Sequence, residues 1–517
     1  MLDKLDRFDF SLLAENQRGI ERESLRVDPK GKVVNTAHPS GLGEKLTNGF
    51  VTVDFSEGLL ELITPPFTDQ GACFGFLKDA TAYTQQSLYN NEIMWAGSMP
   101  PDVTEDEIEI ATFGSNPSAE MKQVYREGLA LRYGKTMQVI SGIHYNFSIS
   151  EKFLDRLEIE GFSGSLMDRK SYLYFRLIKR YYQLSWILPY LFGCSPVCAK
   201  SLASNGASYL QDLDETHYVG EYATSLRMSD LGYQSKAQES LFISCEDVQS
   251  YVHDLLKATD TRYSDYIRFG VKDENGTYLQ LNDNILQIEN EYYNTIRPKQ
   301  IAKCCERPAC ALLKRGVEYM EVRLLDVDIF SEVGIAEETG LFVEVFLMLC
   351  MLASELEYNE TLVLEASDNF EKVVKQGRKP GLALVRNGES KNFKDWGEDI
   401  LKYCMVIAKY MDNGLAEKGE YQKSVQAQIE KLQDVSLTPS ARVLREVEIF
   451  NGSYHDWLLD KSAQHAAALL KYDIPMKSRE LFDQQVQDSI EAWQKMEDAD
   501  MGSFEDYIAG YFNSACG

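Results

Sequence analysis

Short runs with strand-like composition carry acidic side chains at alternating positions, and this spacing constrains the fold more than any other feature of the sequence. The first run is GIERESLR, residues 19–26, in which Glu21 and Glu23 are two positions apart. In a strand, residues i and i+2 lie on the same face, whereas in a helix they are about 200° apart around the axis. Two carboxylates on one face repel each other unless a cation lies between them. For a single pair, a solvated strand face remains the simpler interpretation.

Similar placement recurs in four further runs, which fits surface decoration poorly. Among apolar residues these runs carry Asp54 and Glu61, His144 and Asn146, Glu289 and Glu291, and Glu321 and Arg323. Glu61, for example, lies between Leu60 and Leu62. Convergent carboxylates with one imidazole are a ligand set for hard divalent cations such as Mg²⁺ or Mn²⁺. We therefore expect a metal site, and a structural ion-pair network stays open as the alternative.

The chain divides into a strand-rich part and a helical part, and no repeat or linker separates them. Strand-like runs cover residues 32–36, 50–54, 59–64, 139–150, 279–281, 285–291 and 318–324, with helical stretches at 169–190 and 244–258. Beyond about 331 the pattern is helical: residues 341–352 indicate a buried helix, and one apolar stripe consists of Phe482, Val486, Ile490 and Trp493. We predict an α+β fold in which residues 1–517 form a single domain, sheet-rich to about 330 and mainly helical from about 331.

The charge balance and hydropathy exclude two broad classes of protein. The 517 residues include 53 Lys and Arg against 80 Asp and Glu, a net charge of −27. Because nucleic-acid backbones are bound mainly through Lys and Arg, we expect no nucleic-acid partner. The most apolar stretches, 184–194 and 341–352, are shorter than the roughly 20 residues that a spanning helix needs. With no signal sequence at the N-terminus, these features predict a cytoplasmic protein without a membrane segment.

Several other chemistries fit the sequence less well. Ten cysteines in this length are not a disulfide framework, and Cys304, Cys305 and Cys310 lack a second pair at zinc-site spacing. None of the six histidines belongs to a His-Glu-x-x-His motif. Residues 128–136 resemble a phosphate-binding loop but have five residues between the glycines where four are required. A bound nucleotide would therefore depend on metal ions and on cationic side chains, for which the candidates lie in four polar runs around Arg126, Arg227, Arg297 with Lys299, and Arg378.

Ten segments together resemble the glutamate–cysteine ligase family (γ-glutamylcysteine synthetase), in the form found in γ-proteobacteria. They occur in the family's order between about residues 17 and 445 and read GIERESLRV, VDFSEGLLELITP, YREGL, MQVISGIHYNF, WILPYLFG, YATSLRMSDLGY, LQIENEYYNTIRPK, GVEYMEVRLLD, GRKPGL and SARVLR. The first dozen residues, the segment 304–310 and much of the chain after 450 match poorly. The resemblance implies a fold related to glutamine synthetase and guanidino kinases, in which a mostly antiparallel sheet curls into a funnel.

The resemblance also implies an activity. The family uses ATP to join the γ-carboxyl group of L-glutamate to the amine of L-cysteine through γ-glutamyl phosphate, giving γ-glutamylcysteine in the first step of glutathione biosynthesis. It implies Mg²⁺ as the metal, with Mn²⁺ as a substitute, feedback inhibition by glutathione, and a monomer.

Site residues follow from the resemblance position by position. The family's metal ligands correspond to Glu21, Glu23, Asp54, Glu61, His144 and Glu321. Glu321 and Arg323 are the implied catalytic residues, with Arg323 beside the transferred phosphoryl group. Substrate binding falls to Arg227 on the amino-acid side, with Arg126 as a further candidate, and to a cysteine pocket of Phe55, Tyr125, Gln138, Tyr233 and Tyr293. Arg323 and Arg297 are the candidates on the ATP side, and the adenine pocket is left unassigned.

Three other functions stay open at this point. Another carboxylate–amine ligase of the same superfamily would use a different amine in place of cysteine. A metal-dependent hydrolase would use the same acids and turn over without a second substrate. A non-catalytic acidic protein would bind Mg²⁺–ATP no better than any acidic surface does. Omitting each substrate in turn from an assay of ADP release separates these functions from the ligase.

Overall fold

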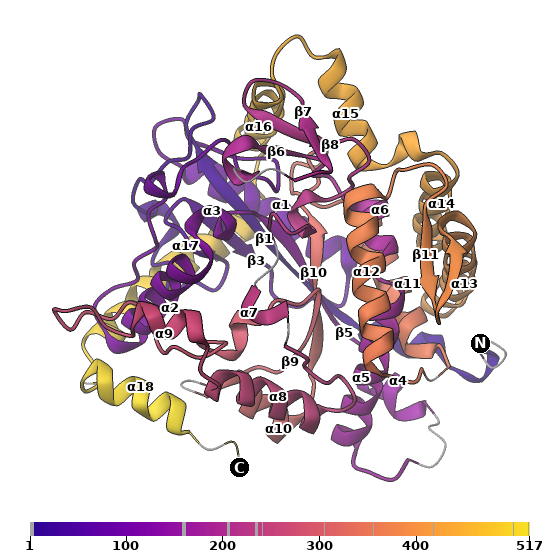
Figure 1. The fold of residues 1–517 in the computed structure, drawn as a ribbon, viewed down its shortest axis with the longest axis horizontal. Coiled ribbons are helices and arrows are strands. Elements are labelled where there is room, and N and C mark those ends of the chain that lie inside the picture. The colour runs from indigo at the N-terminus through magenta and orange to yellow at the C-terminus, as the bar shows by residue number, and fades with distance from the viewer. Residues whose placement is uncertain are drawn as a thin grey trace.

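A central antiparallel sheet crosses the molecule, and helices pack around it (Figure 1). The computed structural model describes residues 5–157, 162–203, 207–232, 236–239, 241–303, 306–354, 356–416, 418–499, 501–514 and 516. Among these residues, seven strands form the sheet in the order β2–β3–β1–β5–β10–β9, with β4 paired to β1, and each pairing is antiparallel. The strands are β1 (Gln17–Val27), β2 (Val51–Val53), β3 (Leu59–Ile63), β4 (Ile93–Met94), β5 (Gly142–Ser148), β9 (Ile296–Lys299) and β10 (Tyr319–Asp326). The predicted α+β class with a mostly antiparallel sheet is confirmed.

Alternation of side chains gives this sheet two different faces. Along β1, Ile20 is buried in the hydrophobic core, so Glu21 and Glu23 lie on the opposite face. On β5 and β10, Tyr145 and Val322 lie on the core side in the same way. We call the side with Glu21 the front face and the side with Ile20 the back face. The strands predicted at 50–54, 59–64, 139–150 and 318–324 are confirmed.

Three predicted strands are wrong. Residues 32–36 form a single bridge, between Val33 and Val27, and no strand. Residues 279–281 and 285–291 form a loop. In this loop, side-chain amides bind backbone groups that would otherwise pair with a neighbouring strand. For example, the side-chain oxygen of Gln287 accepts a hydrogen bond from the Leu281 N–H at 2.9 Å.

The loop also separates Glu289 and Glu291 from the acids of the sheet. Both lie in a short 3₁₀ turn, Glu289–Glu291, and each is paired with an arginine. Arg307 binds Glu289 at 2.8 Å and Arg132 binds Glu291 at 2.9 Å. The alternating run with Glu289 and Glu291 is therefore an ion-pair network, which is the alternative interpretation given for such runs.

Helices cover the back face and the edges of the sheet (Figure 1). Those before residue 331 are α1 (Gln70–Ser87), α2 (Pro117–Tyr133), α3 (Lys135–Gln138), α4 (Glu151–Arg156), α5 (Leu166–Leu184), α6 (Ile187–Phe192), α7 (Lys236–Glu239), α8 (Val248–Asp260), α9 (Ser264–Phe269) and α10 (Pro308–Arg315). Those after it are α11 (Glu337–Leu352), α12 (Glu360–Gln376), α13 (Phe393–Leu415), α14 (Glu420–Gln433), α15 (Pro439–Ile449), α16 (Tyr454–Lys471), α17 (Met476–Glu497) and α18 (Phe504–Asn513). Two small sheets complete the fold: β6 (Val197–Ala199), β7 (Leu210–Asp212) and β8 (His217–Gly220), and the hairpin β11 (Ala383–Arg386) and β12 (Glu389–Asn392).

Helix α11 forms the centre of the core behind the sheet. Each of its residues from Phe342 to Leu352 is buried, as expected for a helix that is apolar on every side. The buried helix predicted at 341–352 is therefore confirmed. The stretch predicted at 169–190 forms two helices, α5 and α6, because Pro189 lacks the N–H that would continue the first of them.

The helical C-terminal part packs against the sheet-rich part at several places. In α17, Phe482 is buried and its ring lies 5.4 Å from that of Phe76 in α1, whereas Ile490 is 40% exposed, so the predicted apolar stripe is buried over part of its length. In α18, Phe504 and Ile508 join the apolar side chains of α2 in one cluster. The core behind the sheet also combines residues from both parts.

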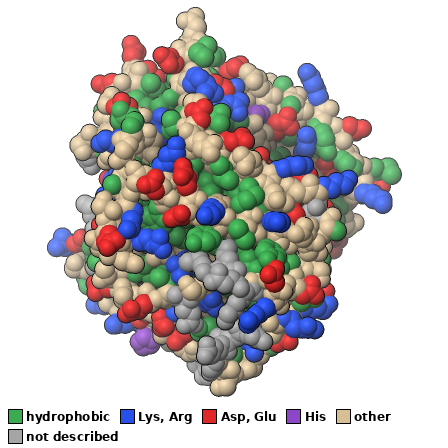
Figure 2. Space-filling model, turned by 90° about the vertical axis from the view of Figure 1, so that its right-hand side faces the viewer, with side chains coloured by type: hydrophobic (Ala, Val, Ile, Leu, Met, Phe, Trp, Pro, Cys, Tyr) green, Lys and Arg blue, Asp and Glu red, His purple; other side chains and the backbone are tan. Residues whose placement is uncertain are grey.

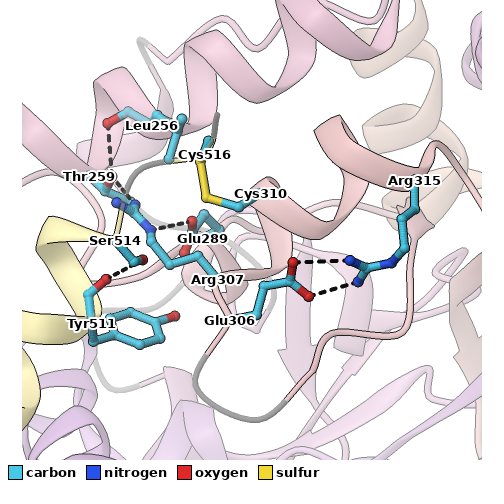
Figure 3. Close-up of a disulfide and its surroundings, with 10 residues drawn as sticks. All are labelled: Leu256, Thr259, Glu289, Glu306, Arg307, Cys310, Arg315, Tyr511, Ser514 and Cys516. Atoms are coloured by element: carbon cyan, nitrogen blue, oxygen red, sulfur yellow. Dashed lines mark hydrogen bonds and ion pairs between the residues drawn. A yellow bond between two sulfur atoms is a disulfide. The ribbon is translucent and has the colours of Figure 1, made fainter.

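A disulfide between Cys310 and Cys516 joins the C-terminal tail to α10 (Figure 3). Spacing alone gave no pairing for these cysteines. Since its sulfur is bonded to Cys516, Cys310 is not available as a metal ligand, and Cys304 and Cys305 lie outside the described residues. The bridge joins residues 206 positions apart, and in chain-entropy accounts a loop of that length contributes up to about 5 kcal/mol of stability.

The surface mixes charges of both signs. On the face drawn in Figure 2, Lys and Arg side chains are interspersed with Asp and Glu side chains. The net charge of −27 is therefore not gathered into one patch on that face. None of the helices that the structure describes has the length and apolar character needed to cross a membrane.

Candidate functional site

The front face of the sheet brings together five of the predicted acidic and imidazole residues from four strands. Strand pairing sets Glu21 of β1 beside His144 of β5, and Glu23 beside Glu61 of β3. Glu321 of β10 lies on the other side of β5, beside Asn146. These neighbours are far apart in sequence, and the antiparallel register makes them adjacent. The predicted convergence on one sheet face is present.

The imidazole of His144 lies at the centre of this group. Its Nδ1 is 2.8 Å from Glu21 Oε2, and its Nε2 is 3.8 Å from Glu23 Oε1. An ionised carboxylate accepts hydrogen bonds, so Nδ1–H is the donor to Glu21. The amide of Asn146 donates to the other oxygen of Glu21 at 2.8 Å. Histidines that bind metals commonly donate their second ring N–H to a carboxylate in this way.

Three side chains have the spacing of metal ligands. One oxygen each of Glu21 and Glu61 and one ring nitrogen of His144 all lie within 4.8 Å of one another. The side-chain carbonyl oxygen of Asn146 is buried and accepts no hydrogen bond from the described residues. Three potential ligand atoms, together with a buried amide oxygen that has no hydrogen-bond partner among the described residues, fit a hard divalent cation such as Mg²⁺ or Mn²⁺.

The electrostatics of the group favour a cation as well. Burial raises the pKa of Glu61 well above its ordinary value, and the neighbouring Glu21, Asp54 and Glu23 raise it further. The pKa of Glu23 is also raised, first by burial and then by Asp54, although His144 opposes the shift. Buried carboxylates that destabilise one another in this way are stabilised by a bound positive charge.

Glu321 has different surroundings from the other acids. Its two oxygens bind Lys299 at 3.1 Å and Arg323 at 2.8 Å. Burial alone would raise the pKa of Glu321, but Lys299, Arg323 and His144 more than offset it and hold the pKa well below its ordinary value. The sequence indicated Lys299 only as part of a run of candidate cations with Arg297, and its contact with Glu321 gives it a place in the site.

Asp54 and Arg126 border the site at the β2 edge. Asp54 directly follows β2 and interacts electrostatically with Glu23 and Glu61. Arg126, on α2, donates from Nε to the backbone carbonyl of Asp54. Its guanidinium also lies over Phe113, 4.5 Å from the ring centre, a contact that no sequence motif indicated. Arg126 thus lies near the acids, and its side chain is held by the Asp54 carbonyl and the Phe113 ring.

The predicted cysteine-pocket residues form two adjoining contacts. Phe55 is buried, and Tyr125 packs against the same cluster. Gln138 Nε2 donates to the hydroxyl of Tyr293 at 3.0 Å. Tyr233 lies outside the described residues. The residues around 128–136, which resembled a phosphate loop, contain the end of α2 and the start of α3.

The predicted arginines make backbone contacts that set their positions. Arg227 lies directly over Gly142, where an added Cβ would come within 1.9 Å of Nη2. The same Nη2 donates to the backbone carbonyl of Arg323 at 3.0 Å. Arg297 on β9 donates to the carbonyl of Asn290 at 3.0 Å, so it holds the loop before the strand.

A cavity of about 540 Å³ lies next to these residues. It is bordered by α5, α12 and the segment that leads into β9, including Tyr293 and Thr295. Aromatic side chains dominate its wall and include Tyr182, Phe242, Tyr292, Tyr358 and Phe370. Met228, the residue after Arg227, also lines it.

Carboxylates clustered around an imidazole, beside arginines and a lysine on one face of an antiparallel sheet, define a class of enzyme site that handles anionic substrates with divalent cations. A model of the glutamate–cysteine ligase family matches residues 3–373. Glutamate–cysteine ligases of Bordetella bronchiseptica and Azotobacter vinelandii are 41% and 42% identical over 502 and 508 residues, which cover 97% of this chain and 94% and 95% of those proteins. The chain belongs to the glutamate–cysteine ligase family, and the resemblance read from its motifs is confirmed.

Solved structures agree with this assignment. The crystal structure of a glutamate–cysteine ligase from Francisella tularensis in complex with AMP has a TM-score of 0.91 and 44% identity, covering 96% of this chain and 97% of that chain. A bifunctional glutathione synthetase from Pasteurella multocida has a TM-score of 0.73 at 24% identity, covering 94% of this chain and 58% of that chain. This second likeness concerns the fold alone.

Proposed function

We propose that this site joins the γ-carboxyl group of L-glutamate to the amine of L-cysteine at the expense of ATP, giving γ-glutamylcysteine, ADP and phosphate. One observation carries the proposal: in a chain of this family, Glu21, Glu61 and His144 offer ligand atoms within 4.8 Å of one another on the sheet face that also bears Arg323. The product is the precursor of glutathione.

The chemistry requires an activated acid. A carboxylate is a poor electrophile, so a γ-carboxylate oxygen of glutamate first attacks the γ-phosphorus of ATP and ADP leaves. The cysteine amine then attacks the carbonyl carbon of γ-glutamyl phosphate, phosphate leaves, and the nitrogen loses a proton. Both steps bring negative charges close together, and the site must lower that repulsion.

Four of the implied metal ligands, Glu21, Glu23, Glu61 and His144, would hold Mg²⁺ or Mn²⁺, with Asp54 and Glu321 beside them. When bound, such ions supply positive charge that neutralises phosphate oxygens. The residues of the chain do the remaining work. His144 is oriented by Glu21, and Glu23 is fixed by the Gly142 N–H, which donates to it at 2.6 Å.

The cationic side chains bind the substrates. Arg323 donates to Glu321 at 2.8 Å, so its guanidinium is held where charge on the transferred phosphoryl group develops. Lys299 and Arg297 on β9, the strand next to β10, add positive charge on the side of the site that we assign to ATP. Arg227 and Arg126 bind the amino acids, and Phe55, Tyr125, Gln138, Tyr233 and Tyr293 form the cysteine pocket.

We propose that residues 1–517 act as one catalytic unit in which the sheet forms a funnel like that of glutamine synthetase and guanidino kinases. Residues from before and after position 331 pack together in the same hydrophobic clusters, which supports a single unit. The family resemblance supports a monomer. An enzyme that consumes ATP needs the cytoplasmic nucleotide pool, and glutathione, as the end product, is the proposed feedback inhibitor.

A coupled assay of ADP release tests the function. With glutamate, cysteine, ATP and Mg²⁺ all present, ADP and γ-glutamylcysteine should form in equal amounts. Omission of any one component should reduce ADP release to the background. Sustained ADP release without an amine would contradict the ligase and support a hydrolase, and faster release with 2-aminobutyrate than with cysteine would contradict the proposed amine.

A further inference from the structure

We propose that Asp326 is a positioning residue for the ligase reaction, because it anchors the turn that carries Arg227. The inference rests on the proposed function, in which Arg227 binds an amino-acid substrate. Asp326 is the last residue of β10, the strand that also carries Glu321 and Arg323. Its side chain is buried, yet it belongs neither to the group of metal ligands nor to the hydrophobic core.

An irregularity in β10 turns the Asp326 side chain to the front face. The strand pairs with β5 in register as far as Val322, and the register shifts between Val322 and Leu325. One extra residue on a strand reverses the alternation of the side chains that follow it. Asp326 therefore pairs with Gly142 and lies on the face of the sheet that carries His144.

Three donors converge on the Asp326 carboxylate. The Ser195 hydroxyl and the Cys194 N–H donate to Oδ2 at 2.7 and 2.8 Å. The Ser225 hydroxyl donates to Oδ1 at 2.7 Å. All three donors come from buried residues, so the carboxylate fixes two chain segments relative to β10.

These segments determine where Arg227 lies. The Ser195 carbonyl accepts the Leu226 N–H at 2.7 Å, and the Ser195 hydroxyl oxygen accepts the Arg227 N–H at 3.3 Å. The Arg227 guanidinium then extends over Gly142 to the carbonyl of Arg323. Asp326 thus holds the backbone end of Arg227, and the backbone of Arg323 holds the guanidinium end.

This placement selects one substrate. Arg323 is proposed to lie beside the transferred phosphoryl group, whose acceptor is the γ-carboxylate of glutamate. A guanidinium held against the backbone of Arg323 is close to that acceptor, so we assign it to glutamate binding. Loss of Asp326 should weaken binding of glutamate in the ground state and in the transition state alike, which raises KM and leaves kcat nearly unchanged.

Steady-state kinetics of three variants test the inference. Asp326→Ala should raise the KM for glutamate about tenfold or more and leave the KM for ATP within about twofold. Ser225→Ala removes one donor and should raise the KM for glutamate by a smaller factor. Asp326→Asn should restore most of the glutamate binding, because its amide oxygen accepts the bonds from Cys194 and Ser195 and its NH₂ donates to Ser225.

Asp79→Ala is the matched control. Asp79 is also buried and accepts two hydroxyl hydrogen bonds, from Tyr472 at 2.9 Å and Ser478 at 2.6 Å, but it joins α1 to the C-terminal helices. Its loss should lower stability without changing the KM for glutamate. Equal increases in the KM for glutamate and for ATP in Asp326→Ala would overturn the inference, as would an unchanged KM for glutamate.

Hydrogen exchange provides a readout that does not need activity. In Asp326→Ala the amides of Leu226 and Arg227 should exchange faster, while the amides of β1 and β5 keep their protection. Unchanged exchange at these two amides would overturn the inference. If Asp326→Ala fails to fold, Ser225→Ala and Asp326→Asn decide the same question. A wild-type protein without ligase activity would contradict the proposed function, and the exchange rates would still decide whether Asp326 holds the turn.

Discussion

A glutamate lies on each side of the central sheet, and the two glutamates have opposite surroundings. Behind the sheet, Glu344 of α11 accepts two hydrogen bonds from Arg18, at 2.8 and 2.9 Å, and one each from the hydroxyls of Tyr145 and Tyr421, at 2.8 and 3.0 Å. In front of it, Glu61 lies among other carboxylates that raise its pKa. Glu344 is fully buried among hydrogen-bond donors, whereas Glu61 is half-buried among other acids.

The difference separates a structural acid from a proposed metal ligand. Glu344 has its charge balanced by Arg18 and its oxygens satisfied, so it holds β1, β5, α11 and α14 together without any ligand. Glu61 is destabilised by its neighbours until a cation is bound, and this unfavourable state persists because the surrounding fold is stable. A buried acid is thus a candidate ligand where its neighbours leave its charge unbalanced.

The largest effect should come from Glu344→Gln. The substitution leaves the Arg18 charge buried without its counter-charge, so the free energy of unfolding should fall by about 3–5 kcal/mol. Turnover per folded molecule should stay near that of the wild type. Denaturant unfolding and ADP release measure the two quantities. Tyr421→Phe, which removes one hydroxyl donor, is the milder control at about 1 kcal/mol. A loss of turnover without a loss of stability would break the comparison.

Arg323→Ala and Glu321→Gln should show the reverse pattern. Each should lower turnover by about two powers of ten or more, equivalent to about 2.7 kcal/mol of barrier. Arg323→Ala removes the positive charge proposed to face the phosphoryl group, and Glu321→Gln removes the carboxylate that holds Arg323 in place. The free energy of unfolding should fall less than in Glu344→Gln, because the Lys299 and Arg323 side chains that pair with Glu321 stay partly exposed to water. Arg442→Ala, which removes an arginine paired with Glu446 at 2.9 Å on α15, is the control for a lost positive charge. Normal turnover in either front-face variant would refute the assigned roles.

The smallest effect should come from Glu61→Gln measured in a chelator. Without metal, removal of one of several repelling carboxylates should raise the free energy of unfolding by about 1 kcal/mol. Added Mg²⁺ should then stabilise the wild type more than the variant, because stabilisation follows the affinity for the ion. Thermal unfolding with and without Mg²⁺ provides both measurements, with Glu318→Gln as the charge-matched control. Equal stabilisation of both proteins by Mg²⁺ would show that Glu61 does not bind the ion.

Local spacing predicted which acids share a sheet face where a strand formed as expected. Glu21 with Glu23, and Glu321 with Arg323, share a face because side chains alternate along β1 and β10. The same spacing failed at Glu289 and Glu291, where side-chain bonds to the backbone prevent a strand. Lys299 was indicated only as one of several candidate cations, because its pairing with Glu321 depends on the neighbouring strand. Asp326 was missed, because the irregularity in β10 decides which face its side chain lies on.

The sequence by itself determined which residues are chemically suited to the site and which of them share a strand face, because a period of two is a property of the local chain. It also determined the family, through motifs that keep their order. Only the tertiary structure decided which strands are neighbours, in what register, and hence that Glu61 meets Glu23 while Glu344 meets Arg18. Register and helix packing depend on contacts between segments hundreds of residues apart, and no local pattern encodes the free energy of those contacts.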